Sequence, residues 1–144
     1  CMRVLTATVG VNILTETLIG TQPVNATAVV QNGSTPTAIF NVAATGSNLT
    51  FQWQESTDGG ATFANVTTGT GATTTAYTKA PLSLTDDDKQ FRCIVTGDCG
   101  VETSDPATLN VQDASGVSNE IEDAGPNGGD GGSGTTGRTT RKTG

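Results

Sequence analysis

Short stretches of alternating apolar and polar residues, separated by turn-forming clusters, run from residue 22 to residue 112. Alternation with a period of two is typical of a strand with one buried face. The spacing of the stretches predicts about seven strands, the number that a two-sheet sandwich needs. The predicted strands lie at residues 28–30, 38–43, 49–54, 62–66, 73–78, 90–96 and 107–111.

Composition favours the same fold class. Thr is the most frequent residue, with 28 copies, and its β-branched side chain suits a pleated, half-exposed surface and disfavours helix. We therefore predict an all-β chain with an N-terminal extension (1–20), one sandwich (21–112) and a C-terminal tail (113–144). The tail is first acidic, then Gly-rich, and ends with Arg138, Arg141 and Lys142. A tail of this composition cannot bury a core of its own.

The charge of the chain bears on its partners. The net charge is −7 and the pI is about 4.2, and no basic stripe interrupts this excess of acid. Nucleic acid is therefore not an expected partner. No apolar run approaches the ~20 residues of a membrane span, and no signal peptide precedes Cys1, so we expect a soluble chain that is either mature or truncated.

Three cysteines bear on the compartment: Cys1, Cys93 and Cys99. Cys93 and Cys99 enclose a strand end and a Gly97-Asp98 turn, which predicts a disulfide across a hairpin. Such a bridge stabilises the fold by about 2 kcal/mol at most and persists only in an oxidising compartment, so we expect export to the cell surface or beyond. Cys1 stands alone, and three interpretations stay open: a lipid-modified lipoprotein residue, a fragment boundary, or a free thiol.

The N-terminal extension predicts one strand, because five apolar residues alternate with Thr6, Thr8, Gly10 and Asn12. The sandwich is complete without this strand, so the apolar face of the strand needs another partner. The strand either folds back as an extra edge strand or is donated to a neighbouring copy, which would build an open helical homopolymer. The residues of this candidate polymerisation strand are Leu5, Ala7, Val9, Val11 and Ile13.

Two segments carry a resemblance to a known fold family. Trp53 is followed 40 residues later by Cys93 in Asp87-Asp88-Lys89-Gln90-Phe91-Arg92-Cys93, which resembles the strand C tryptophan and the D-x-G-x-Y-x-C pattern of immunoglobulin-like domains. More closely, Phe51-Gln52-Trp53-Gln54 with Asp58-Gly59-Gly60, and Phe91 to Gly97 with Cys99-Gly100, are similar to the immunoglobulin-like repeats of large surface proteins of Bacteroidota-type bacteria. The resemblance covers residues ~22–112 and implies a Greek-key sandwich.

The chain departs from that family at two positions. Phe40 stands where the family has the strand B cysteine, and Phe91 stands where it has the corner tyrosine. Neither the inter-sheet disulfide nor the corner hydrogen bond is therefore expected. Phe40 can instead fill the space over Trp53, with a burial contribution of about 2 kcal/mol. The expected core residues are Phe40, Val42, Trp53 and Phe91.

Catalytic and metal chemistry have little support. The chain contains no His, so Ser-His-Asp and Cys-His catalysis and imidazole zinc ligands are excluded, and we expect no enzyme activity, metal or cofactor. Residues 56–63 match S-x-D-x-G-x-T-W/F, the Asp box of sialidase-like propellers. That motif serves folding, and without repeats a plain turn between two strands is favoured. Asp86, Asp87 and Asp88 either ligate calcium or form a solvated turn, and the turn is favoured.

Four N-x-S/T sequons are candidate glycosylation sites, with ordinary surface polarity as the alternative. Their asparagines are Asn25, Asn32, Asn48 and Asn65.

The sequence predicts two functions. The first is a structural subunit of an extracellular, pilus-like bacterial fibre, in which copies of the chain exchange strands and pack their tails. The alternative is a cell-surface adhesion or ligand-binding module of a larger repeat protein, with residues 65–75 among its display loops. The scarcity of aromatic residues disfavours a sugar-stacking platform for that module.

Overall fold

The computed structural model describes residues 3–7 and 10–114, with side chains from Ile13 onward. Cys1, Val9 and the tail from residue 115 lie outside the described residues, as do the side chains of Leu5, Ala7 and Val11. Candidate lipidation at Cys1 and tail packing therefore stay predictions.

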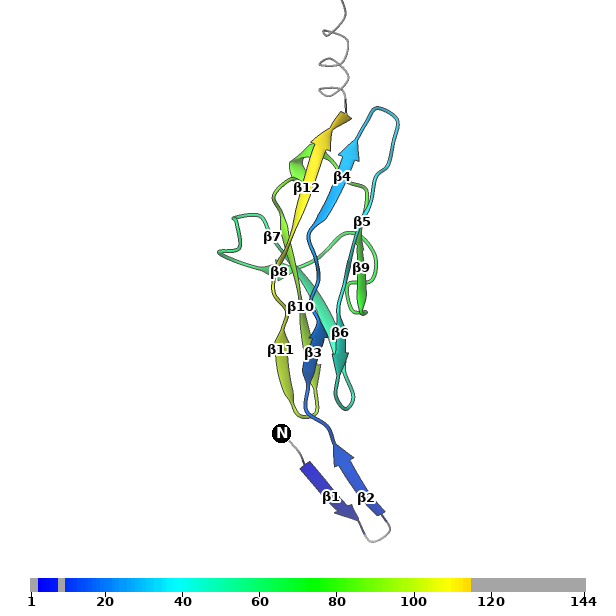
Figure 1. Cartoon of the computed structure of the whole chain (residues 1–144), viewed down its shortest axis with the longest axis vertical. Coiled ribbons are helices and arrows are strands. Elements are labelled where there is room, and N and C mark those ends of the chain that lie inside the picture. Colours follow the sequence, from blue (N-terminus) through cyan, green and yellow to red (C-terminus); the bar gives the residue numbers. More distant parts are fainter. Residues whose placement is uncertain (1–2, 8–9, 115–144) are drawn as a thin grey trace, which may run out of the picture. The chain divides into compact units, whose positions relative to one another are not determined.

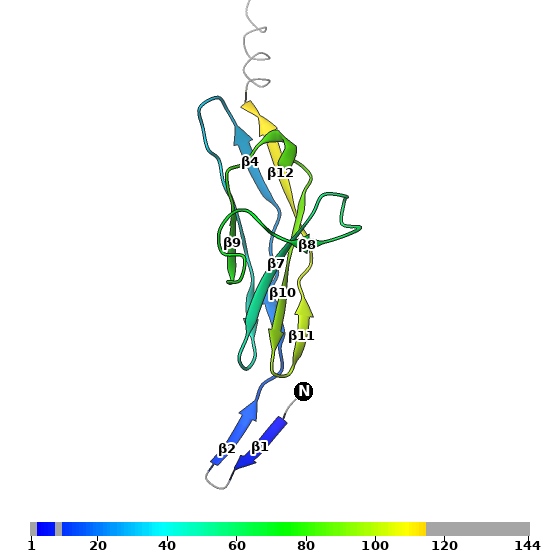
Figure 2. The same cartoon turned by 180° about the vertical axis from the view of Figure 1, so that it is seen from behind.

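Two layers of strands form a sandwich (Figures 1 and 2). The larger sheet has the order β4–β12–β10–β7–β8, and β11 pairs with β10 beyond the end of β12. The second layer consists of two antiparallel pairs, β3 with β6 and β5 with β9. The larger sheet comprises β4 (Ala26–Val30), β7 (Thr50–Ser56), β8 (Ala64–Asn65), β10 (Gln90–Gly97), β11 (Gly100–Thr103) and β12 (Ala107–Asp113). The second layer comprises β3 (Leu18–Thr21), β5 (Ala38–Asn41), β6 (Ala43–Thr45) and β9 (Ala76–Lys79), and a 3₁₀ turn, η1 (Leu84–Asp86), precedes β10.

The core lies between the two layers and is built on four aromatic rings. The strands alternate in burial, as in β10, where Phe91, Cys93 and Val95 are buried. The ring of Phe40 lies 4.7 Å from that of Phe91 and 6.4 Å from that of Trp53, measured between centroids. Phe40, Val42, Trp53 and Phe91 are each at most 5% exposed. The predicted all-β sandwich is confirmed.

The predicted single N-terminal strand is wrong. The segment forms two antiparallel strands, β1 (Arg3–Ala7) and β2 (Gly10–Leu14), which make a two-stranded sheet of their own. Ala7 pairs with Gly10, and Leu5 pairs with Asn12. Of the candidate polymerisation residues, Leu5 and Ala7 therefore lie in β1, and Val11 and Ile13 lie in β2. A two-residue connection preserves a period-two pattern, so alternation alone could not show where the chain reverses.

The predicted Cys93–Cys99 disulfide is also wrong, and both residues are thiols. Gly97 pairs with Gly100, so Cys99 lies in the tip of the β10–β11 hairpin. Cys93 lies far from that tip, where its N–H donates to Ser104 Oγ (2.8 Å) and its carbonyl accepts from Ser104 N (2.9 Å). Five residues of strand span roughly 16 Å, and a bridge needs Cα atoms within ~7 Å. Burial raises the pKa of the Cys93 thiol to about 11, which keeps it protonated and unreactive. Cys93 and Cys99 therefore do not indicate an oxidising compartment.

Candidate functional site

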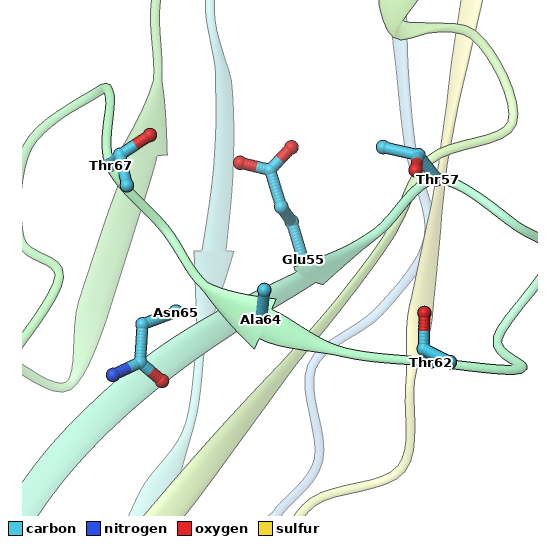
Figure 3. Close-up of a pocket in the computed structure, with 6 residues that line it drawn as sticks. All are labelled: Glu55, Thr57, Thr62, Ala64, Asn65 and Thr67. Carbon is cyan, nitrogen blue, oxygen red and sulfur yellow. The ribbon is translucent and has the colours of Figure 1, made fainter.

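A shallow recess of about 370 Å³ opens beside β8, the short outer strand of the larger sheet. Figure 3 shows Glu55 and Ala64 projecting to one side of the sheet and Asn65 to the other, with Thr57 and Thr62 at one end and Thr67 at the other. Hydroxyl, amide and carboxylate groups therefore dominate its lining. We call this site the β8 recess, and its residues are Glu55, Thr57, Thr62, Ala64, Asn65 and Thr67.

A charged cluster lies behind the β8 recess. Lys89 Nζ lies 3.4 Å from the Glu55 carboxylate and donates a hydrogen bond of 2.7 Å to Asp86. Lys79 Nζ lies 3.5 Å from the same Asp86 oxygen. Burial opposes ionisation of Asp86, but the hydrogen bond from Lys89, the Ser83 amide and the two lysine charges outweigh it and lower the pKa of Asp86. Two carboxylates thus meet two ammonium groups, and the cluster carries no net charge.

The loop before β8 forms one wall of the recess and is held by the Asp-box residues. The Asp58 carboxylate accepts hydrogen bonds from Ser56 Oγ (2.6 Å), Thr62 N (2.9 Å) and Thr62 Oγ1 (2.6 Å). Gly60 N in turn donates to Ser56 Oγ (2.9 Å). The hydrogen bonds that the Asp58 carboxylate accepts, led by the one from Ser56, lower its pKa from 3.8 to about 2. The motif builds the turn between β7 and β8.

We expect a carboxyl-carbon NMR titration of the full chain to place the Asp58 midpoint near 2. The Thr62→Val variant removes the Thr62 hydroxyl and keeps the volume, so its Asp58 midpoint should rise towards 3.8, while its strands stay folded by circular dichroism. A midpoint near 3.8 in the unmodified chain would show that these bonds are not formed in solution.

A threonine-rich loop of residues 67–75, which we call the threonine loop, begins at the edge of the recess with Thr67, its one residue in the lining. Three core groups hold its backbone: Trp53 Nε1 donates to Thr74 O (2.9 Å), Tyr77 Oη to Thr68 O (2.9 Å), and Trp53 N to Ala72 O (2.8 Å). Burial, with the nearby charges of Glu55 and Asp86, raises the pKa of Tyr77 to about 12, so the hydroxyl stays a donor. The loop is fixed in place while its threonines at 67, 68, 70, 73, 74 and 75 remain exposed.

A row of polar side chains crosses the outer face of the sheet towards the recess. Arg92 Nε donates to Gln54 Oε1 (3.0 Å), and Gln54 Nε2 donates to Asn65 Oδ1 (3.0 Å). The Arg92 guanidinium lies 3.9 Å from the ring centroid of Phe63, which is a cation–π contact. Arg92 therefore covers the aromatic side chain near the recess and is linked to Asn65 through Gln54.

The four sequon asparagines are all exposed, but they lie at different places. Asn65 lines the β8 recess, whereas Asn25 Oδ1 accepts a hydrogen bond from Thr108 N (2.8 Å). Asn48 Nδ2 donates to Asp98 Oδ2 (2.6 Å), and Asn32 lies in a turn before β5. The structure does not bring the four together, and glycosylation stays a prediction.

Sequence reasoning missed the charged cluster and Tyr77. Asp86 was expected in a solvated turn but is only 5% exposed, because Lys79 and Lys89 surround it. Tyr77 is the only tyrosine, and its position in a predicted strand was the one available signal. Within residues 13–114, no three His, Cys, Asp or Glu side chains are grouped as metal ligands. No helix in the described part of the chain is long and apolar enough to cross a membrane.

Comparisons with known proteins place this sandwich in a fold class. A family model described as "Domain of unknown function (DUF8696)" matches residues 20–113. A solved structure of Sidekick-1 immunoglobulin domains 1–5 matches with a TM-score of 0.52 and 14% identity over 76% of this chain and 24% of that chain. Sidekick-1 immunoglobulin domains 1–4 match with a TM-score of 0.53 and 16% identity over 69% of this chain and 25% of that chain. No curated protein matches in sequence.

These matches show an immunoglobulin-like fold, which confirms the fold that the sequence resemblance implied. The chain spans about a quarter of the length of the two solved structures.

Proposed function

The chain belongs to the family described as "Domain of unknown function (DUF8696)", and from its one sandwich with a fixed polar edge we propose that it is a non-catalytic binding module of a bacterial surface protein. The observation that carries the proposal is the threonine loop. Core groups hold its backbone at Thr68, Ala72 and Thr74, yet its threonines are exposed to solvent. A surface ordered before binding loses little conformational entropy when a partner arrives.

The chemistry of the β8 recess indicates the kind of partner. The Glu55 charge is balanced by Lys89, and Arg92 covers the ring of Phe63. The recess therefore presents neither a strong electrostatic field nor an uncovered face of that aromatic ring. Hydroxyl and amide groups remain, which bind through directed hydrogen bonds. The partner is therefore a polar surface rich in hydrogen-bonding groups.

The path of the chain through the sandwich fits a unit of a longer protein. β3 begins at the end that carries the β6–β7 and β10–β11 turns, and β12 ends at the opposite end, beside Asp87 (Figure 1). A module with its two connections at opposite ends can be joined head to tail. The resemblance of residues 22–112 to repeats of bacterial surface proteins supports export.

The test is site-specific photo-cross-linking in the organism that makes the protein. A photoreactive phenylalanine derivative replaces Thr67 in the recess, and a matched control replaces Asn110, which is exposed on β12, three strands away from β8. We expect one discrete adduct from position 67 and none from position 110. No adduct from position 67, or the same adducts from both positions, would overturn the proposal.

A fibre subunit is the second candidate, and the β1–β2 sheet favours it. A two-stranded sheet is marginally stable alone in water, and Ile13 in β2 is 56% exposed. Strand addition from another copy would complete this sheet. Sedimentation velocity of the full chain tests this: polymers that vanish when residues 1–13 are deleted support a fibre. A monomer at high concentration, or cross-links at position 67 to a different protein, supports the binding module.

A further inference from the structure

The short connection between β2 and β3 is packed against the sandwich. It consists of residues 15–17, and its flanking Leu14 and its last residue, Thr17, are only 7% and 3% exposed. A flexible linker keeps its side chains in water and has few fixed contacts. In this connection, by contrast, the side chains of Leu14 and Thr17, on either side of residues 15 and 16, are buried.

Hydrogen bonds join the connection to two turns of the sandwich. Thr15 N donates to Ser47 Oγ (2.9 Å), and the Thr15 and Ser47 hydroxyls lie 3.3 Å apart. Ser47 O accepts a hydrogen bond from Asp98 N (2.9 Å), and Asn48 Nδ2 donates to Asp98 Oδ2 (2.6 Å). The connection, the β6–β7 turn and the β10–β11 turn are thus linked through Ser47 and Asp98.

Two glycines allow the connection to approach these turns closely. A Cβ at Gly97 would collide with Thr17 Oγ1 and would lie 2.9 Å from Leu49 Cδ2. A Cβ at Gly46 would lie 3.2 Å from both Glu16 O and the Thr17 Cα. Gly46 also has a φ of +149°, which L side chains rarely adopt. Such contacts exist only if residues 15–17 rest on the two turns.

We infer that residues 14–17 form a fixed joint, and that this segment docks on the end of the sandwich at Ser47 and Gly97. The joint sets the direction in which β2 leaves the sandwich. A preceding segment would then be carried at a defined angle and could not swing freely. This inference is independent of the β8 recess and of any partner bound there.

The test is backbone NMR of the full chain labelled with ¹⁵N. We expect the steady-state {¹H}–¹⁵N NOE values of Thr15, Glu16 and Thr17 to equal those of the sandwich strands, and the Thr15 amide to be protected from exchange. Ser47→Ala removes the acceptor of the Thr15 amide and should speed its exchange at least tenfold. Gly97→Ala should lower the NOE values of residues 15–17. Gly20→Ala is the matched control, because the nearest atom to its Cβ would be Ala43 O, 3.9 Å away.

Values for residues 15–17 well below those of the strands in the unmodified chain would overturn the joint. So would unchanged exchange of the Thr15 amide in Ser47→Ala. If Gly97→Ala fails to fold, Ser47→Ala alone tests the joint. Removing the Ser47 hydroxyl leaves the backbone hydrogen bond from Asp98 N to the carbonyl of residue 47 in place.

Discussion

Trp53→Ala is expected to lower the free energy of unfolding by about 3–5 kcal/mol, a large share of the ~5–15 kcal/mol that stabilises a domain. Trp53 is fully buried, and its ring centroid lies 6.0 Å from that of Tyr77 and 6.4 Å from that of Phe40. Truncation leaves a cavity between the two layers. It also leaves Thr74 O without the indole N–H, which loosens the threonine loop.

Urea denaturation followed by far-ultraviolet circular dichroism measures this change. Fluorescence would not serve, because Trp53 is the only tryptophan and the variant lacks it. Ile39→Ala is the control: Ile39 is 55% exposed on β5, and its loss should change the free energy by no more than about 0.5 kcal/mol. A loss below about 1 kcal/mol for Trp53→Ala would contradict the core described above.

Asp86→Asn is expected to cost about 3–5 kcal/mol, because a buried ion pair that loses one partner leaves the opposite charge uncompensated. Lys79 and Lys89 both point at Asp86, with their Nζ atoms 3.5 and 2.7 Å from its Oδ1. The side chains of Asp86 and Lys79 are 6% and 9% exposed, so water cannot replace the carboxylate. Asp105→Asn, at an exposed position, should change stability by less than about 0.5 kcal/mol.

The same carboxylate makes stability depend on pH. The folded pKa of Asp86 is lowered, so the unfolded chain binds a proton more readily than the folded one. The contribution of Asp86 is complete above its ordinary pKa of 3.8 and is lost as the pH falls below that value. Asp58 acts in the same direction between 3.8 and about 2. The urea midpoint, measured at pH 7, 5 and 3, should therefore fall less steeply with decreasing pH in Asp86→Asn than in the unmodified chain. Equal dependence on pH in the two proteins would contradict the ion-pair geometry.

Local pattern predicted much of the fold. Alternation predicted seven strands. Three of the predicted stretches lie within observed strands, namely those in β4, β10 and β12. Three more overlap observed strands, namely those at β7, at β9, and at β5 with β6. β8 is shorter than its predicted stretch, and β3 and β11 were missed because each has only four residues and little burial contrast. The Asp-box turn was predictable because every group that forms it lies between Ser56 and Thr62.

The sequence by itself determined the all-β class, the strand periodicity, three of the four core aromatic residues (Phe40, Trp53 and Phe91) and the Asp-box turn, because each depends on residues close together in the chain. Only the tertiary structure decided that the N-terminal segment is a hairpin, that Cys93 and Cys99 lie apart, and that Glu55 meets Lys89 across 34 positions. Strand pairing selects one register among several that the same alternation allows. The charges of Lys79 and Asp86 could be read from the sequence, but their burial depends on how the two layers close.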